Sequence, residues 1–215
     1  KRLLLSVVEG AGTVFPSASM RMVMFQNVAM ALFFMGSYIV TMPLLVREVY
    51  DGSAQDLAFM NGANSLGLVV TILLLLRLGD VRRQGRALLL SQGIGALVLC
   101  GAAVAPSFGL WVLALFVWGT CGGMAMTMSR TIMQEQAPPS QRGRVMSFYA
   151  FSFMGAGPIG AVLNGDLVDL FDPQLALLIA AGSMFAVILI VGIGSGLWRL
   201  ESHAHQVLEE SGRAV

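Results

Sequence analysis

Long uncharged, mostly apolar stretches alternate with short charged segments along this chain. Residues 22–46, 57–76 and 87–129 contain no charged side chain, and they are 25, 20 and 43 residues long. A helix of about 20 apolar residues crosses the hydrocarbon core of a bilayer. A single helix of the third stretch would reach about 65 Å, roughly twice the thickness of that core. We therefore expect two helices there, joined by the turn signal Pro106–Gly109.

The same pattern along the whole chain predicts an all-α membrane protein with six transmembrane helices. Their expected bounds are 22–46, 57–76, 87–105, 110–129, 145–165 and 173–198. Residues 1–21 are expected to form a cytoplasmic segment, either an amphipathic helix at the membrane interface or a plain linker. Residues 199–215 are expected to be a polar cytoplasmic tail. The chain starts without methionine and without a signal-peptide pattern, so we expect it to be a piece of a longer polypeptide.

Basic residues fall on alternate connections between these helices. Of the 13 Lys and Arg side chains, Arg47 is the one placed on the second side, and the segment 77–86 alone holds four arginines. Loops rich in Lys and Arg stay in the cytoplasm. The distribution predicts a bacterial inner-membrane protein with both termini and the segment 77–86 on the cytoplasmic side.

Composition agrees with a membrane protein and argues against other classes. The chain is 56% hydrophobic and 12% charged, with a mean hydropathy of +0.77, and its net charge of +1 gives no reason to expect nucleic acid as a partner. No paired carboxylates, activated serine or metal-ligand cluster occurs in or beside the spans, so we expect neither an enzyme nor a cofactor. His203 and His205 lack Cys or acidic ligands at metal spacing, so no metal site is expected.

Polar side chains are unevenly distributed among the predicted helices. The first, second, fourth and fifth carry amides, hydroxyls and aromatic groups, which must face protein or water inside a membrane, whereas the third and sixth are almost entirely apolar. Two stripes at helical spacing mix aromatic, small and polar groups, as suits an amphiphilic organic ligand. They contain Asn27, Phe34, Tyr38 and Thr41 on the first helix, and Phe116, Thr120 and Thr127 on the fourth.

The basic segment resembles a cytoplasmic loop motif of the major facilitator superfamily. That motif contains glycine, aspartate and basic residues in close order, and its counterparts here are Gly79, Asp80, Arg82, Arg83, Gly85 and Arg86. Six helices with basic loops after the second and fourth are similar to the C-terminal half of such a transporter, its helices 7 to 12. The resemblance implies a half bundle built from a 3+3 inverted repeat.

A second resemblance is to the branch of that superfamily that contains enterobactin exporters and macrolide-efflux proteins (transmembrane secretion effectors). It is carried by residues 134–165, QEQAPPSQRGRVMSFYAFSFMGAGPIGAVLNG, by residues 10–21, GAGTVFPSASMR, and by Tyr38 and Pro43. The resemblance implies secondary export of small molecules such as siderophores or drugs by alternating access. It also implies that helices 1 and 4 line the central cavity and that an N-terminal six-helix half is a partner.

Asp80 lies where the negative end of a helix dipole disfavours an anion, so it needs a cationic partner. Available partners on the same face are Arg82, Arg83, Arg130, Arg142 and Arg144. The family resemblance favours a charge latch that stabilises the state closed to the cytoplasm and breaks when the halves rock. The alternative is a topogenic basic loop with an ordinary surface ion pair.

Gly155, Gly157, Pro158 and Gly160 indicate either a close helix crossing with a pliable point or ordinary packing of small residues. The spans have no central carboxylate, lysine or histidine. If protons drive transport, we expect the titrating group in the absent half or at Asp166 or Asp169, although a solvated helix end explains those two aspartates better.

Together these features predict the C-terminal half of a secondary active exporter of amphiphilic small molecules. The alternative is a membrane-embedded assembly or interaction protein with the same helical bundle that transports nothing. Polar stripes on the first and fourth helices favour the transporter, whereas a dry and tightly packed interior would favour the alternative.

Overall fold

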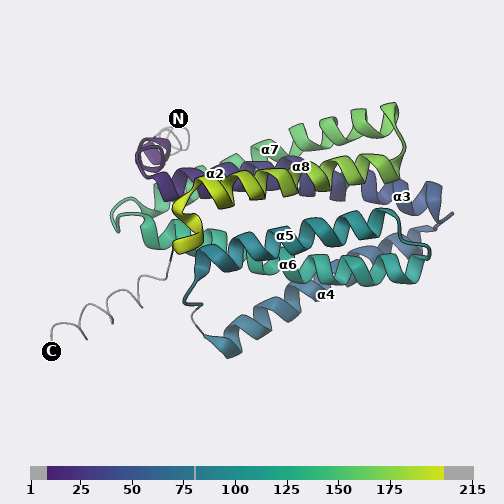
Figure 1. Cartoon of the computed structure of the whole chain (residues 1–215), viewed down its shortest axis with the longest axis horizontal. Helices are drawn as coiled ribbons and strands as arrows, with labels where there is room; N and C mark the ends of the chain where they lie inside the picture. Colours follow the sequence, from purple (N-terminus) through teal and green to yellow (C-terminus); the bar gives the residue numbers. More distant parts are fainter. Residues whose placement is uncertain (1–8, 80, 201–215) are drawn as a thin grey trace.

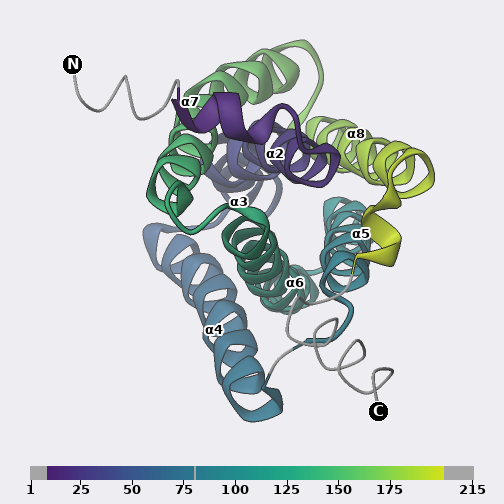
Figure 2. The same ribbon diagram turned by 90° about the vertical axis from the view of Figure 1, so that its left-hand side faces the viewer.

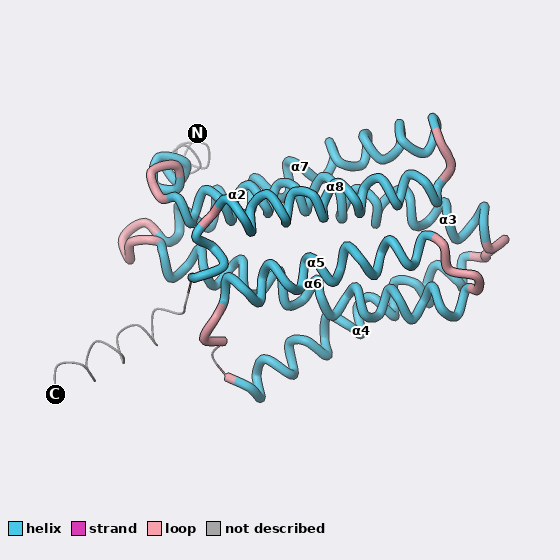
Figure 3. Tube along the Cα trace, viewed as in Figure 1, coloured by secondary structure: helices cyan, strands magenta, loops and turns pink. Residues whose placement is uncertain are grey.

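The computed structural model describes residues 9–79 and 81–200. This part of the chain is helical throughout, with short connections and no β-strand (Figure 3). It contains six helices that are long and apolar enough to cross a membrane. The predicted fold class, an all-α membrane protein with a six-helix half bundle, is confirmed.

The first of these helices, Ala18–Val49, is a continuous rod in which the hydrogen-bonding pattern changes. It starts as an α-helix, widens to π-helical turns in its middle and returns to an α-helix. In order, these parts are α2 (Ala18–Met30), η1 (Ala31–Met35), η2 (Ser37–Thr41) and α3 (Met42–Val49). We call the whole rod the first span. In these wider turns the backbone bonds reach one residue further than in an α-helix, as the bond from the Gly36 N–H to the Ala31 carbonyl shows.

The other helices follow in antiparallel order. They are α4 (Ala54–Leu78), α5 (Gln84–Ala103), α6 (Phe108–Gln136), α7 (Arg142–Leu170), α8 (Pro173–Gly194) and the short 3₁₀-helix η3 (Gly196–Arg199). α6 and α7 have 29 residues each, so each reaches about 44 Å, well beyond the roughly 30 Å hydrocarbon core.

Most helix ends differ from the expected bounds, and the largest differences are at the ends of α6, α7 and α8. Arg130, Arg142 and Arg144 lie on the ends of helices α6 and α7, because the connection between these helices is only residues 137–141. The last expected helix stops at Gly194, since Ser195 adopts an extended backbone and η3 follows as a separate turn. Charged side chains therefore extend α6 and α7 beyond the apolar core, whereas α8 is shorter than expected.

Polar caps at the helix starts explain where the chain turns. The Ser53 backbone N–H donates to Asp56 Oδ2 at 2.8 Å, and the Ser53 hydroxyl accepts from the Gln55 N–H, which forms a capping box for α4. At the start of α6 the Ser107 side chain accepts from the Leu110 N–H, and at the start of α8 the Asp172 side chain accepts from the Leu175 N–H. These three caps lie at one end of the bundle, together with α3 (Figure 1).

α6 lies at the centre of one part of the bundle, where it packs against both α4 and α5. α5 also packs against α8, and α7 packs against the first span. Seen along the helices, α4 lies at the edge of the molecule and has α6 as its main neighbour (Figure 2).

The described ends of the chain, at residues 9 and 200, lie at one end of the bundle with the connections α4–α5 and α6–α7 (Figure 1). This end carries most of the arginines, and we call it the arginine-rich end. Residues 9–14 form a helical segment that runs across this end of the bundle (Figure 2).

Candidate functional site

A cavity of about 240 Å³ lies between the first span, α4, α6 and α7. These are the four helices whose polar side chains predicted an interior face. The lining consists of Met30, Phe34, Met35, Tyr38, Asn64, Leu68, Trp118, Gly119, Gly122, Met126 and Phe153. The cavity is open on one side to the surface of the bundle.

Three aromatic rings form one wall of this cavity. Trp118 of α6 contacts Phe34 edge to face, with ring centroids 5.7 Å apart, and Tyr38 in a tilted arrangement at 5.9 Å. The Tyr38 hydroxyl donates a hydrogen bond of 2.5 Å to Asn61 Oδ1 on α4, which fixes the position of its ring. The wall thus joins the first span, α4 and α6 through rings that offer flat apolar faces.

The rest of the lining is soft and uncharged. Three methionine thioethers face the cavity, and they adapt easily to ligands of different shape. Asn64 supplies an amide. No lining residue is an acid, base or histidine within the described part of the chain. This surface suits a molecule with extended apolar or aromatic surface and a few hydrogen-bonding groups.

The structure places Phe34 and Tyr38 in the cavity wall, whereas the other two residues predicted on the first span lie between helices. Asn27 is 2% exposed, and its Nδ2 donates to the Tyr149 carbonyl of α7 at 3.3 Å. Thr41 is fully buried, and its hydroxyl donates to Asn164 Oδ1 at 3.3 Å. Both side chains join the first span to α7.

The three residues predicted on α6 lie outside the cavity lining. Thr120 donates to the Phe116 carbonyl at 3.1 Å, and Thr127 donates to the Gly123 carbonyl at 2.8 Å. Their hydroxyls therefore bond one turn back within their own helix, as hydroxyls in apolar helices commonly do. Contact of these residues with a ligand stays a prediction.

The face of α6 that lines the cavity carries Trp118, Gly122 and Met126 instead. These residues recur every four positions, which is helical spacing. This stripe carried a signal in the sequence, because a large ring is followed one turn later by a glycine that leaves space beside it. The polar stripe on α6 is a poorer guide to the cavity, because its threonine hydroxyls bond to their own helix.

The connection between α4 and α5 holds the residues that resemble the loop motif. Gly79 ends α4 with a positive φ of 75°, which favours glycine. Asp80 lies outside the described residues, so its pairing in a charge latch stays a prediction. Arg82 and Arg83 are exposed beside the start of α5.

The last two motif residues, Gly85 and Arg86, contact η3. The Gly85 N–H donates to the Leu200 carbonyl at 3.4 Å, and Arg86 Nε donates to the Trp198 carbonyl at 3.2 Å. The Arg86 guanidinium also lies over the Trp198 ring, 5.3 Å from its centroid. The motif therefore attaches the start of α5 to the segment that follows α8.

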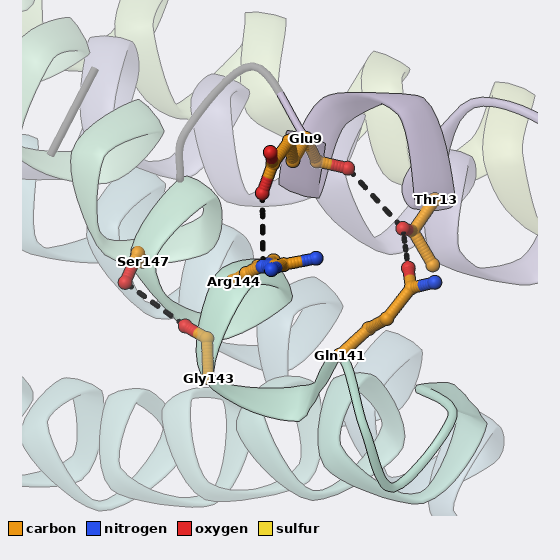
Figure 4. Close-up of polar contacts among 6 residues, drawn as sticks. All are labelled: Glu9, Thr13, Gln141, Gly143, Arg144 and Ser147. Carbon is orange, nitrogen blue, oxygen red and sulfur yellow. Dashed lines mark hydrogen bonds and ion pairs between the residues drawn. The ribbon is translucent and has the colours of Figure 1, made fainter. Parts of the chain in front are cut away.

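Of the basic residues proposed as latch partners, Arg130 and Arg142 are exposed at the arginine-rich end. Arg144 pairs with Glu9, with 2.9 Å between Nε and Oε2 (Figure 4). Close by, the Thr13 hydroxyl bonds to Gln141 Oε1. The segment 9–14 is thus attached to the start of α7, which brings together the two sequence segments that carried the second resemblance.

The glycine-rich part of α7 contains one close helix crossing. A Cβ on Gly160 would lie 2.5 Å from the Leu32 carbonyl oxygen of the first span. A Cβ on Gly155 would meet no neighbour within 4 Å, and one on Gly157 would just reach Met35 Sδ. Pro158 lies inside the helix and is exposed. Whether these residues act as a hinge stays a prediction.

Asn164, one turn beyond Gly160, is a functional candidate that the sequence analysis missed. It is 1% exposed, and its Oδ1 accepts from the Ser37 hydroxyl at 2.8 Å. Its Nδ2 donates to the Leu32 carbonyl at 3.1 Å and to the Gly160 carbonyl at 2.8 Å. A signal existed, because Asn164 is the one amide among residues 145–165.

The titratable candidates lie away from the cavity. Asp166 and Asp169 are exposed on α7 at the end opposite the arginine-rich end. In the described part of the chain, no three His, Cys, Asp or Glu side chains are close enough to hold a metal ion. His203 and His205 lie outside the described residues.

The family model of the Major Facilitator Superfamily matches residues 24–212. Curated relatives include the enterobactin exporter EntS of Shigella boydii serotype 18, which is 27% identical over 163 residues, and EntS of Escherichia coli O127:H6, at 28% over 163 residues. An uncharacterized MFS-type transporter of Bacillus subtilis strain 168, YwfA, is 27% identical over 136 residues.

The matched regions make up a much larger share of this chain than of its relatives. The match to the enterobactin exporters covers 72% of this chain and 38% of each exporter. The match to YwfA covers 62% of this chain and 33% of that protein. No solved structure matches the chain significantly.

Proposed function

Because the chain belongs to the Major Facilitator Superfamily, we propose that it forms one six-helix half of a secondary transporter that exports amphiphilic small molecules. The cavity between the first span, α4, α6 and α7 is the observation that carries this proposal. Alternating access needs a central binding site that a rocking motion of two halves exposes to each side in turn. We assign that site to this cavity.

The chemistry of the cavity supports an amphiphilic cargo over an ion or a sugar. Phe34, Tyr38 and Trp118 offer ring faces, and methionines line much of the remaining wall. A sugar would need many hydrogen-bonding groups, and a small ion would need charged or closely spaced oxygen ligands. Two of the relatives are named as exporters of enterobactin. We therefore propose siderophores or drug-like amphiphiles as cargo.

The exposed apolar faces of α4 and α7 support a second six-helix half as the partner. On α4, Leu66, Val69 and Ile72 are about half exposed, and on α7, Met154 and Val162 are 74% and 65% exposed. Both helices border the cavity. We propose that an N-terminal half covers these faces and closes the other side of the cavity, with the arginine-rich end in the cytoplasm.

Accumulation assays in cells that lack their own efflux pumps test this function. Cells that express the full-length protein should retain less of an added amphiphile, with enterobactin and a macrolide as the first two probes. Trp118→Ala removes the central ring of the cavity wall, and loss of an aromatic contact should weaken export about three- to ten-fold. Leu113→Ala is the matched control, because Leu113 lies on the same helix and is 57% exposed away from the cavity.

Equal export by Trp118→Ala and Leu113→Ala would show that the cavity does not take part in transport. No export of any amphiphile by the unmodified protein, despite its presence in the membrane, would favour a membrane protein that assembles with partners but transports nothing.

A further inference from the structure

A second groove lies between α5, α8 and η3. These elements are on the side of the bundle that faces away from α4 (Figure 2). The volume of the groove is about 370 Å³. The cavity assigned to cargo is lined by other helices, so this groove has no part in the proposed function.

The floor and walls of this groove are apolar along its length. On α5 the lining residues recur at helical spacing, and on α8 a matching stripe runs beside them. The α5 stripe is Leu89, Leu90, Gly93, Ile94 and Leu97. Ile94 and Leu97 are 49% and 57% exposed, and Ile193 of α8 is 87% exposed. In a membrane protein such a surface meets lipid chains.

The groove has a cationic end. Arg86 lies three residues before Leu89 and four before Leu90, so its side chain continues the same stripe on α5. Its guanidinium lies over the ring of Trp198, which itself lines the groove, and its Nε bonds to the Trp198 carbonyl. These contacts hold the planar cation at the groove's end and, among the described residues, leave its two terminal nitrogens for a further ligand.

The length of the groove and the positive charge at its end together indicate the ligand. From Leu89 to Leu97 the groove follows about 12 Å of helix, which suits an extended hydrocarbon chain. A guanidinium at one end of such a groove matches a phosphate, with which arginine forms paired hydrogen bonds. We propose that the groove binds one acyl chain of an anionic glycerophospholipid from the leaflet at the arginine-rich end, and that Arg86 holds its phosphate.

Lipid retention by the purified full-length protein tests this site. The protein is reconstituted in phosphatidylcholine mixed with phosphatidylglycerol, extracted gently, and the lipids that stay bound are identified by native mass spectrometry. Arg86→Gln should lower the preference for phosphatidylglycerol about five-fold, the usual effect of one basic residue near an anionic lipid surface. Ile94→Trp fills the groove and should lower the retention of both lipids.

Each variant has a matched control. Arg77→Gln removes a charge from the same end of the bundle outside the groove, and Ile190→Trp adds the same bulk to an exposed position of α8 that does not line it. Both controls should retain lipid as the unmodified protein does.

The proposal is overturned if Arg86→Gln keeps the same preference as Arg77→Gln, or if Ile94→Trp retains as much lipid as Ile190→Trp. If Arg86→Gln does not give folded protein, the lipid retained by Ile94→Trp is compared with that retained by Ile190→Trp, and this comparison tests the proposal. Neither readout depends on what the protein transports.

Discussion

At the scale of single residues, Asn164 is the side chain whose contacts matter most for the packing of α7 against the first span. It bonds to the Ser37 and Thr41 hydroxyls and to the Leu32 and Gly160 carbonyls. Leu32 belongs to the π-helical turns of the first span. The amide therefore joins α7 to the first span through one backbone carbonyl and two hydroxyls.

Asn164→Ala should lower the thermal stability of the purified protein. It leaves the Leu32 carbonyl and the Ser37 hydroxyl without this partner, and the expected cost is about 1–2 kcal/mol, the upper part of the range for polar contacts inside membrane proteins. The measurement is the unfolding temperature in detergent. Ser147→Ala on the same helix is the control, because its hydroxyl bonds only one turn back at an exposed position. Equal unfolding temperatures for both variants would contradict the role given to Asn164.

Single residues also show how far polarity in the sequence predicts a site. The sequence predicts Phe34 and Tyr38 in the cavity, and both line it. Large aromatic rings on an interior helix pack into the space between helices. Hydroxyls were poor guides, since Thr120 and Thr127 bond to their own helix and need no cavity. Which side of α6 faces inward depends on its packing against α4, and a sequence alone does not show that packing.

At the scale of helices, the crossing of α7 and the first span depends on two facing glycines. A Cβ on Gly36 would lie 2.4 Å from the Gly160 carbonyl oxygen, and one on Gly160 would approach the Leu32 carbonyl as closely. Small residues at such a crossing allow two backbones to touch. In the sequence, Gly155, Gly157, Pro158 and Gly160 give the same signal for close packing. In the structure, Gly160 is the one of these three glycines where an added Cβ would clash with a neighbouring backbone.

Gly160→Ala should destabilise the protein by about 1–3 kcal/mol, because two packed backbones would have to separate. Gly155→Ala should have little effect on stability, since an added Cβ there meets open space. Monodispersity and unfolding temperature in detergent compare the two. A tolerated alanine at position 160 would show that the crossing is looser than described.

The helical segment 9–14 is attached to α7 by a similar close approach. A Cβ on Gly10 would lie 2.4 Å from the Arg144 carbonyl oxygen, beside the Glu9–Arg144 ion pair. Both side chains of that pair are about half exposed, so the pair itself contributes little stability. The steric fit of Gly10 therefore holds the segment more firmly than the charges do.

Gly10→Val should release the segment 9–14 from α7, whereas Gly12→Val should leave it attached, because Gly12 has no neighbour within 4 Å. Hydrogen exchange of the backbone amides of residues 9–17 measures the difference, and faster exchange is expected for Gly10→Val alone. If both variants exchange alike, the segment is not held by this contact.

At the scale of the whole molecule, alternation of apolar and charged stretches was enough to predict the six-helix bundle. Each long uncharged run corresponds to a helix or a pair of helices. Helix ends were less predictable, since α6 and α7 extend beyond the apolar core on charged turns such as Arg130 and Arg142. The site needed three-dimensional information, because its lining comes from four helices that are far apart in the sequence.

The proposed transport and lipid binding both require that the six helices cross the membrane with the arginine-rich end in the cytoplasm. Labelling of single cysteines in intact cells tests this most directly, after Cys100 and Cys121 are replaced by serine. Gln55→Cys lies at the end of the bundle that also carries Arg47, and Arg82→Cys lies in the arginine-rich connection between α4 and α5.

A membrane-impermeant thiol reagent should label the cysteine at position 55 in intact cells, and it should label the one at position 82 only after the cells are opened. Labelling of position 82 from outside intact cells, or of neither position in membranes of opened cells, would contradict the six crossings and the orientation on which the account depends.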